Sequence, residues 1–399
     1  MITLADIRAA RERVAPVVRP TPVDASTTLS RLAGRPVLLK PEHLQRTGSY
    51  KIRGAYNLIS QLPPGCEVVA ASAGNHAQGV ALAASLTGHR STIFMPANAP
   101  LPKTEATRAY GAEIVLAGEV VDDCIAAARR YAEETGARFV PPFDDPLVIA
   151  GQGTVGLELA DECDETLEVV VVPIGGGGLI SGVATALAHT RRNVKVVGVE
   201  AAGAPAMQAA LSAGIPVALA RVSTMADGIA VRSVSELTLA HAKAYVDEVV
   251  TVTEEEISRA LLLLIERTKA VVEPAGAVGL AAILAGKVSG SGTALAILTG
   301  GNVDPLLMMK LIDHGLSAAG RYLMLRIILG DQPGALAALT GAIAHMGLNV
   351  LEVEHHRSGL TLGVDEVEVL VTLETRDPEH REHIVTGLQA AGFSVELVR

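Results

Sequence analysis

Lys51 is the residue of this 399-residue chain whose setting best suits covalent chemistry. It follows the turn-like run Gln45-Arg-Thr-Gly-Ser-Tyr50 and opens a helical pattern of apolar residues over positions 52–59. The positive end of a helix dipole disfavours a protonated amine, and Schiff-base chemistry requires a neutral one. Most lysines are solvated surface residues. Lys51 alone therefore does not decide between a reactive and an ordinary lysine.

A second feature is the run Gly175-Gly176-Gly177-Gly178, which joins an apolar strand pattern to a helical one. Glycines let the backbone approach an anion, and a helix start offers free N–H groups, so phosphate binding is favoured over a tight turn alone. The absence of GK[ST] excludes a nucleotide P-loop. A spacing of Gly176-x-Gly178-x-x-x-Gly182, with Glu200 ending the next strand, keeps a nicotinamide-dependent oxidoreductase open as an alternative.

The elements that must position these residues alternate between buried strands and amphipathic helices from about residue 37 to residue 315. This alternation predicts an α/β fold of mainly parallel sheets, in one or two lobes. Three polar motifs follow apolar strands, namely SAGNH from Ser72, GGGGL from Gly175 and TGGN from Thr299. Ligands lie at the carboxyl ends of strands in such sheets, so we expect the three motifs to meet. The expected strands are 68–71, 92–95, 113–116, 169–173, 194–200 and 294–298; the expected helices include 75–86, 121–134 and 179–189.

Composition narrows the class of protein. The chain is 49% hydrophobic and 19% charged with a net charge of −10, which suits a soluble protein and disfavours nucleic acid or membrane partners. Cys66, Cys124 and Cys163 are scattered, without the spacing of a disulfide framework or a zinc site. No apolar run reaches about 18 residues, and the first residues are charged, so we expect a cytoplasmic protein.

The pattern changes after residue 315. Residues 316–321 read as a linker, and residues 322–399 form a different unit. Its expected order is strand 322–329, turn 331–334, helix 335–346, strands 350–355 and 366–373, helix 378–391 and strand 394–398. This is the βαββαβ order of a ferredoxin-like domain.

A pyridoxal phosphate site would use all of the motifs together. A lysine binds the aldehyde, glycines bind the phosphate, an amide such as that of Asn75 contacts the ring oxygen, and a hydroxyl such as that of Thr299 meets the pyridine nitrogen. A dinucleotide enzyme has no use for the lysine or for the Asn-bearing loop.

The stretches PEHLQRTGSYKIRGA, SAGNHAQGVA, IAGQGTVGLE, VPIGGGGLISG and LTGGNVD resemble those of fold-type II pyridoxal-phosphate enzymes, specifically the threonine ammonia-lyases. The resemblance covers about residues 5–315 and implies a two-lobed catalytic domain over 1–315, with a small lobe of about 52–150 inserted in the large lobe. It implies that Lys51 binds the aldehyde, Asn75 the ring oxygen and Thr299 the ring nitrogen, where many relatives have serine. The phosphate would be held by Gly175, Gly176, Gly177, Gly178 and Leu179.

The substrate residues that this resemblance implies are Ser72, Asn75, His76, Gly228 and Glu273. His76 is equally well explained as a packing histidine. Glu273 is equally well explained as an acid at a helix start, where the helix dipole stabilises a negative charge. Arg53 is interpreted as part of a surface ion pair and is left out of the site.

Two positions separate the chain from the related serine racemases. Ala73 stands where they place a serine that acts as a second acid or base, so we expect little racemisation. Glu200 lies where they bind a divalent metal, but no second acid follows within six residues, so we expect no required metal.

The C-terminal unit resembles an ACT domain, an amino-acid-sensing module, through DQPGAL and GLNV. This implies effector contacts at Pro333, Gly334, Ala335, Leu336 and Asn349, and side-by-side pairing of copies. The whole resemblance predicts deamination of L-threonine to 2-oxobutanoate, with L-serine as a secondary substrate, control by isoleucine and valine, and a homo-oligomer. A serine racemase or serine dehydratase, an NAD(P)-binding oxidoreductase and a non-catalytic sensor remain alternatives.

Overall fold

The computed structural model describes residues 1–318, 320–357 and 362–398. The chain divides by its internal contacts into two compact units, Met1–Met308 and Met309–Arg399. The division falls inside helix α13 (Pro305–Ala318), so the expected linker at 316–321 begins within that helix. The boundary at residue 315 itself stays a prediction. Within the described residues, no helix is long and apolar enough to cross a membrane.

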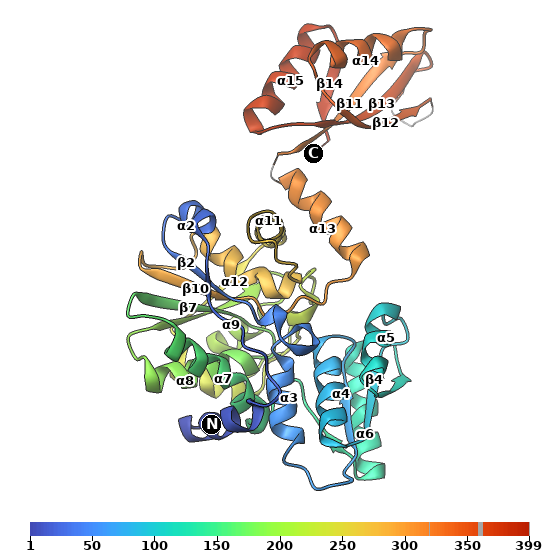
Figure 1. Cartoon of the computed structure of the whole chain (residues 1–399). Coiled ribbons are helices and arrows are strands. Elements are labelled where there is room, and N and C mark those ends of the chain that lie inside the picture. The colour runs from blue at the N-terminus through green and yellow to red at the C-terminus, as the bar shows by residue number, and fades with distance from the viewer. Residues whose placement is uncertain (319, 358–361, 399) are drawn as a thin grey trace. The chain divides into compact units, whose positions relative to one another are not determined.

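The first unit is built on two sheets, as the alternating pattern predicts (Figure 1). The larger sheet has the order β1-β2-β10-β7-β8-β9, and only β1 runs antiparallel to its neighbour. Its strands are β1 (Asp24–Ala25), β2 (Val37–Lys40), β7 (Leu167–Pro173), β8 (Lys195–Ala201), β9 (Glu248–Val252) and β10 (Thr293–Ile297). Strand β9 is missing from the sequence-based prediction because its residues are only partly buried and its hydrophobic pattern is correspondingly weak.

The smaller sheet is entirely parallel and has the order β5-β4-β3-β6. Its strands are β3 (Val68–Ala71), β4 (Ser91–Met95), β5 (Glu113–Leu116) and β6 (Arg138–Phe139). The chain enters this sheet after residue 59 and returns to the larger sheet at β7, so the small lobe is an insertion between β2 and β7. Every residue of β3 and β4 is buried, which is why both read as continuous apolar runs.

Helices cover both sheets, and α3 (Lys51–Ile59) contacts α4 of the small lobe and α7 of the large lobe. The close contact between α7 and α8 depends on small residues, since a Cβ atom at Gly182 would lie 2.4 Å from the carbonyl oxygen of Ile149. The other helices of this unit are α1 (Leu4–Val14), α2 (Thr27–Ala33), α4 (Asn75–Thr87), α5 (Leu101–Ala109), α6 (Val121–Thr135), α7 (Pro146–Glu162), α8 (Gly178–Thr190), α9 (Ala206–Ala213), α10 (Glu236–Tyr245), α11 (Glu254–Leu263) and α12 (Pro274–Leu284).

The second unit confirms the βαββαβ prediction. Its elements are β11 (Tyr322–Gly330), α14 (Ala335–His345), β12 (Val350–His356), β13 (Glu366–Glu374), α15 (Pro378–Ala390) and β14 (Ser394–Leu397). The antiparallel sheet has the order β12-β13-β11-β14. Alternate residues of β11 and β13 are buried, and they form one core with α14 and α15.

Candidate active site

Lys51 is the first residue of α3, as expected from the sequence. The preceding segment turns sharply, because Thr47 and Gly48 both have left-handed backbone conformations, with φ of 62° and 69°. The N–H of Tyr50 then donates to the carbonyl oxygen of Thr299 at 3.3 Å, and Ser49 forms a bridge with Gly300. These contacts hold the start of α3 against the segment that follows β10.

The amine of Lys51 lies in protein surroundings that favour its neutral form. Its Nζ atom donates to the carbonyl oxygen of Pro142 at 2.9 Å and lies 5.2 Å from the ring centre of Tyr50. Burial lowers the pKa of Lys51 to about 8, against an opposing effect of the Glu273 carboxylate. The lowered pKa predicted from the helix start is therefore caused mainly by loss of solvation.

The glycine loop connects β7 to α8 at the carboxyl end of the large sheet. Gly177 requires glycine because its φ is 91°, and a Cβ atom at Gly176 would lie 2.1 Å from the ring of Phe143. No side chain caps α8, so the first N–H groups of this helix remain available to an anion. Leu179 follows as the second residue of the helix and is buried.

Asn75 lies at the start of α4 in the middle of a chain of side-chain hydrogen bonds. Its Nδ2 atom donates to Oε1 of Glu273 at 2.6 Å, and its Oδ1 atom accepts from Nδ2 of Asn302 at 2.7 Å. Asn302 also donates to the carbonyl oxygen of Thr47 at 2.6 Å. The amide of Asn75 is thus oriented by partners on two other loops.

Glu273 immediately precedes α12, but its side chain does not cap this helix. The carboxyl group instead lies near Asn75 and Gly300, where a Cβ atom on Gly300 would be 2.3 Å from Oε1. Burial, and after it the charge of Asp227, raises the pKa of Glu273 to about 7. Glu273 therefore lies at a helix start, as the sequence indicates, but it is also a buried carboxyl group whose pKa is near neutrality.

The other expected residues lie around the same centre. Ser72 follows β3 and accepts a hydrogen bond from the N–H of Gly74 at 3.1 Å, while Thr299 follows β10 and is buried. A Cβ atom on Gly228 would lie 3.3 Å from Oε1 of Glu273. His76 is buried, its Nε2 atom donates to the carbonyl oxygen of Val140 at 2.8 Å, and burial lowers its pKa to about 3. His76 is therefore a neutral, internally bonded histidine.

Sequence reasoning missed the segment 140–143. Its backbone oxygens accept from His76 and from Lys51, and its Phe143 ring packs on the glycine loop. A short Pro-Pro sequence between a two-residue strand and a helix carries no motif that signals these contacts. Asn302 ends the TGGN motif and has no role in the sequence interpretation, although an amide next to a glycine pair suggests a cross-loop hydrogen bond.

These residues fit pyridoxal phosphate. The chain provides an amine with a lowered pKa, an uncapped helix start after four glycines, and a buried hydroxyl at Thr299. Among the described residues, the buried hydroxyls of Ser49 and Ser181 lack a hydrogen-bond partner. Ser49 precedes Tyr50 and bridges Gly300, and Ser181 lies in the first turn of α8, so a ligand bound at the start of this helix would offer the Ser181 hydroxyl a partner.

Comparison with known proteins agrees with this geometry. Residues 14–300 match the model of the pyridoxal-phosphate dependent enzymes, and residues 323–396 match that of the ACT domain. The chain belongs to the pyridoxal-phosphate dependent enzymes. It is 47% identical to the L-threonine ammonia-lyase of Thermotoga maritima, over the whole of both chains. It is 42% identical to a biosynthetic L-threonine dehydratase of Mycobacterium tuberculosis, over 98% of this chain and 92% of that one.

A solved structure supports the same family assignment. Threonine deaminase isoform 2 of Solanum lycopersicum, in its processed form, superposes with a TM-score of 0.74 and 37% sequence identity, covering 78% of this chain and 92% of that one. The predicted fold class, a two-lobed catalytic region followed by an ACT domain, is thereby confirmed.

The expectation that no metal is required depends on the surroundings of Glu200, which lies near the end of β8. It is buried, and its carboxylate accepts from the N–H groups of Met207 at 2.7 Å and Gln208 at 2.9 Å, at the start of α9. Burial raises the pKa of Glu200 to about 7. No group of three or more His, Cys, Asp or Glu side chains suited to a metal ion occurs among the described residues.

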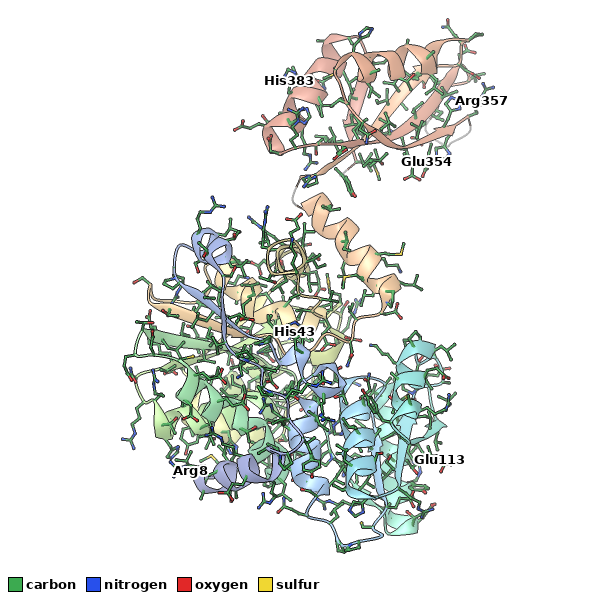
Figure 2. All side chains as sticks on the ribbon, in the orientation of Figure 1. Arg8, His43, Glu113, Glu354, Arg357 and His383 are labelled. Carbon is green, nitrogen blue, oxygen red and sulfur yellow. The ribbon has the colours of Figure 1, made fainter. Side chains whose placement is uncertain are left out.

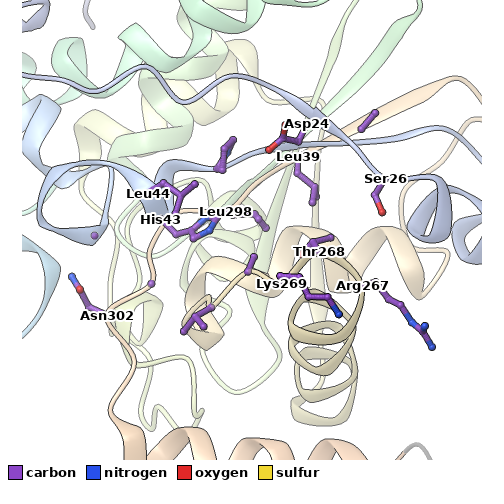
Figure 3. A pocket seen from close by; sticks show the side chains of 16 residues that line it. Asp24, Ser26, Leu39, His43, Leu44, Arg267, Thr268, Lys269, Leu298 and Asn302 are labelled. Atoms are coloured by element: carbon purple, nitrogen blue, oxygen red, sulfur yellow. The ribbon is translucent and has the colours of Figure 1, made fainter.

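A cavity of about 590 Å³ lies beside the active site (Figure 3). Gly301 and Asn302 belong to its wall, together with Asp24, Ser26, His43 and Lys269. Figure 2 shows His43 in the interior of the catalytic unit, where it is buried, in contrast to the exposed Arg8 and Glu113. The cavity and the active site therefore share the TGGN loop.

Arg53 corrects the sequence interpretation most clearly. It is completely buried, and its guanidinium group donates to both carboxylate oxygens of Glu42 at 2.7 and 2.8 Å and to both of Glu158 at 2.6 and 3.0 Å. A fifth hydrogen bond reaches Thr154 at 3.0 Å. The expected surface ion pair is a buried one that joins α3 to α7.

The ACT domain separates its expected effector residues into two groups. Pro333, Gly334, Ala335 and Leu336 follow the end of β11, whereas Asn349 precedes β12 and donates to Glu374 at 3.2 Å. Glu374 pairs with Tyr322 at the beginning of β11, so the two groups lie at opposite ends of the sheet. A cavity of about 390 Å³ at the Asn349 end is lined by Arg321, Glu374, Arg376 and His380 among others.

Proposed function

We propose that the protein is a threonine ammonia-lyase, which converts L-threonine to 2-oxobutanoate and ammonia. The observation that carries this proposal is the amine of Lys51, whose pKa is lowered to about 8. The residue before it, Tyr50, hydrogen-bonds to Thr299 after β10. The acceptor of the Lys51 amine, Pro142, precedes Phe143, whose ring lies against the glycine loop after β7. The names of the relatives at 42% and 47% identity support the choice of threonine.

The binding residues have separate tasks in this proposal. Lys51 binds the aldehyde of pyridoxal phosphate, and the N–H groups from Gly175 to Leu179 hold its phosphate. The amide of Asn75 contacts the ring oxygen and the hydroxyl of Thr299 the ring nitrogen. When bound, the cofactor supplies an electron-withdrawing ring that stabilises negative charge at the substrate Cα atom.

Residues of the chain itself carry out the proton transfer. In its neutral form, the amine of Lys51 would remove the Cα proton of the bound substrate. Ser72, Asn75 and the backbone N–H groups at the start of α4, that of His76 included, bind the substrate carboxylate. Gly228 and Glu273 line the same site from the large lobe. The β-hydroxyl leaves with a proton as water, and the released enamine hydrolyses to 2-oxobutanoate and ammonia.

L-Serine presents its hydroxyl at the same position, so it should react to pyruvate as a secondary substrate. Loss of one methyl contact typically costs only about 1–3 kcal/mol. Racemisation should stay minor, because Ala73 offers no second proton-transferring group in the loop.

The same proposal assigns regulation to the ACT domain. Isoleucine should inhibit and valine oppose it, through Pro333, Gly334, Ala335, Leu336 and Asn349, in a cytoplasmic homo-oligomer with a biosynthetic role. Removal of residues 321–399, or Asn349→Ala in the full chain, should abolish the inhibition and leave basal turnover. Unchanged sensitivity to isoleucine in both variants would reject this assignment.

The test of the catalytic proposal is a visible spectrum of the purified protein with pyridoxal phosphate, before and after threonine, with 2-oxobutanoate measured. Lys51→Ala should lose both the cofactor's protein-bound absorbance and turnover. Lys195→Ala, at an exposed lysine that begins β8, is the matched control and should keep both. Substantial threonine deamination by Lys51→Ala would disprove the mechanism.

A further inference from the structure

One ion pair links the small lobe to the wall of the active site. Lys103 lies in the first turn of α5, and its Nζ atom is 2.8 Å from Oδ2 of Asp227. Asp227 begins the 3-10 helix Asp227–Ile229 of the large lobe, 124 residues further along the chain. The side chain of Lys103 is 18% exposed and that of Asp227 is 55% exposed, so this contact is shielded from solvent on the lysine side only.

The segment that Lys103 holds lies directly behind the site. A Cβ atom on Gly228 would be 2.9 Å from Ala275 and 3.3 Å from the Glu273 carboxyl group. A Cβ atom on Gly175, the first residue of the glycine loop, would be 3.1 Å from Cα of Ile229. Residues 227–229 therefore separate Glu273 from the glycine loop, so a movement of this segment would change the surroundings of both.

A second contact between the same parts supports the link. Asp122, at the start of α6 in the small lobe, lies 3.8 Å from Arg232, five residues after Asp227. Both side chains are more than half exposed, so this pair is the weaker one. Both contacts nevertheless place a small-lobe charge opposite its counter-charge on one short stretch of the large lobe.

We propose that Lys103 is a positioning residue, whose ion pair with Asp227 holds the small lobe closed over the substrate site and keeps Gly228 and Glu273 in place. The proposal rests on the proposed threonine ammonia-lyase activity. Ser72, Asn75 and His76 come from the small lobe, whereas Glu273 and Gly228 come from the large lobe. A substrate that touches both sets needs the lobes together, and the pair stabilises that arrangement before threonine arrives.

The pair also adjusts the charge around Glu273. After burial, the charge of Asp227 is the main cause that raises the pKa of Glu273, and the charge of Lys103 opposes it. The groups near this carboxyl are Lys51 on α3, Asn75 on α4, Lys103 on α5, Asp227 on the 3-10 helix and Tyr50 before α3. Loss of Lys103 should move the titration of Glu273 to higher pH, and loss of Asp227 should move it to lower pH.

The experiment compares Lys103→Met, Asp227→Asn and the double variant in the full chain with cofactor bound. Each single variant should raise KM for threonine about three- to tenfold with kcat within about twofold, because fewer molecules are in the closed form. The double variant should cost no more than either single one, since both remove the same contact. Lys103→Arg should restore KM, whereas Arg108→Met, which removes a pair within α5 (Arg108 with Glu105, 2.6 Å), should have no effect.

Two further measurements separate positioning from general damage. The limb of the kcat/KM pH profile that Glu273→Gln abolishes should shift upward in Lys103→Met and downward in Asp227→Asn. In the cofactor-free protein, amide hydrogen exchange of residues 101–109 should be faster in both variants and unchanged in Arg108→Met. Unchanged KM in both single variants, additive losses in the double variant, or pH shifts of the same sign would overturn the proposal. A wild-type protein without threonine turnover would instead reject the proposed function.

Discussion

Replacement of Arg53 by methionine should destabilise the catalytic unit strongly. The side chain is completely buried, and its five N–H groups donate to Glu42, Glu158 and Thr154. Methionine fills much of the same volume but leaves the buried Glu42 carboxylate with a single hydrogen-bond partner among the described residues, the Thr21 hydroxyl at 2.6 Å. Removal of one partner from a buried ion pair typically costs about 3–5 kcal/mol, and we expect a loss of that size.

The matched control is Arg90→Met. Arg90 also pairs with a glutamate, Glu67 at 3.0 Å, but its side chain is 84% exposed. Exposed pairs contribute about 0–1 kcal/mol, so this variant should unfold close to wild type. Urea unfolding followed by circular dichroism measures both. Arg53→Lys should fall between, because it keeps the charge and loses the forked geometry.

The same substitution should have a characteristic pH dependence. Burial raises the pKa of Glu158, but Arg53 and Lys40 together outweigh this effect and lower the pKa below its ordinary value of 4.5. A carboxyl group whose pKa is lowered by folding stabilises the fold at pH values above its unfolded-state pKa. This stabilisation is lost as the pH falls through the folded-state pKa. The cost of Arg53→Met should therefore be largest near about pH 7 and shrink toward about pH 4. A cost below about 1 kcal/mol at neutral pH, or one equal to that of Arg90→Met, would refute the reasoning.

Glu273→Gln should remove a pH-dependent penalty: the pKa of Glu273 is raised to about 7 by burial first and by Asp227 second, so wild-type stability should fall as the pH rises from about 4.5 to 7. Between pH 5 and pH 8 the wild-type protein should lose on the order of 1–3 kcal/mol of its free energy of unfolding, measured with urea in the cofactor-free state, and the variant should not. An identical pH dependence in both proteins would count against a buried, titrating carboxyl group. Gly176→Ala should weaken cofactor binding and cost about 1–3 kcal/mol, because its Cβ atom would lie 2.1 Å from the Phe143 ring, which must then move. Gly341→Ala on α14, where a new Cβ atom meets nothing within 4 Å, is its control in cofactor titrations and thermal unfolding, and equal behaviour of the two would contradict the crowding argument.

Much of the fold could be predicted from the sequence because several of its strands, such as β3, β4 and β10, are buried on both faces. β3 and β5 lie at their expected bounds, and β4, β7, β8 and β10 differ by one or two residues. The four-residue strand β2, strand β9 and the two-residue strands β1 and β6 were not predicted, since short or half-exposed strands leave little hydrophobic pattern. The order of the strands within each sheet also depends on long-range pairing, such as that of β2 with β10, which no local signal reports.

The motifs indicate a candidate site because each one follows a strand of a parallel sheet. What they could not supply was the contacts that cross between loops. The bond from Lys51 to Pro142, that from Asn75 to Glu273 and the pair of Lys103 with Asp227 join residues 91, 198 and 124 positions apart. The burial of Arg53 was missed for the same reason, as its partners lie on distant elements.

The opposite placement of the two groups of expected effector residues has a consequence for the ACT domain. Nine residues of β11 separate them, a length of roughly 30 Å at about 3.3 Å per residue, and a free amino acid is far shorter than this. A single molecule that touched both Pro333 and Asn349 would therefore have to sit between two neighbouring chains lying in opposite directions. Such a domain would bind the amino acid only while the chains are associated, so dilution of the protein would be enough to abolish its response.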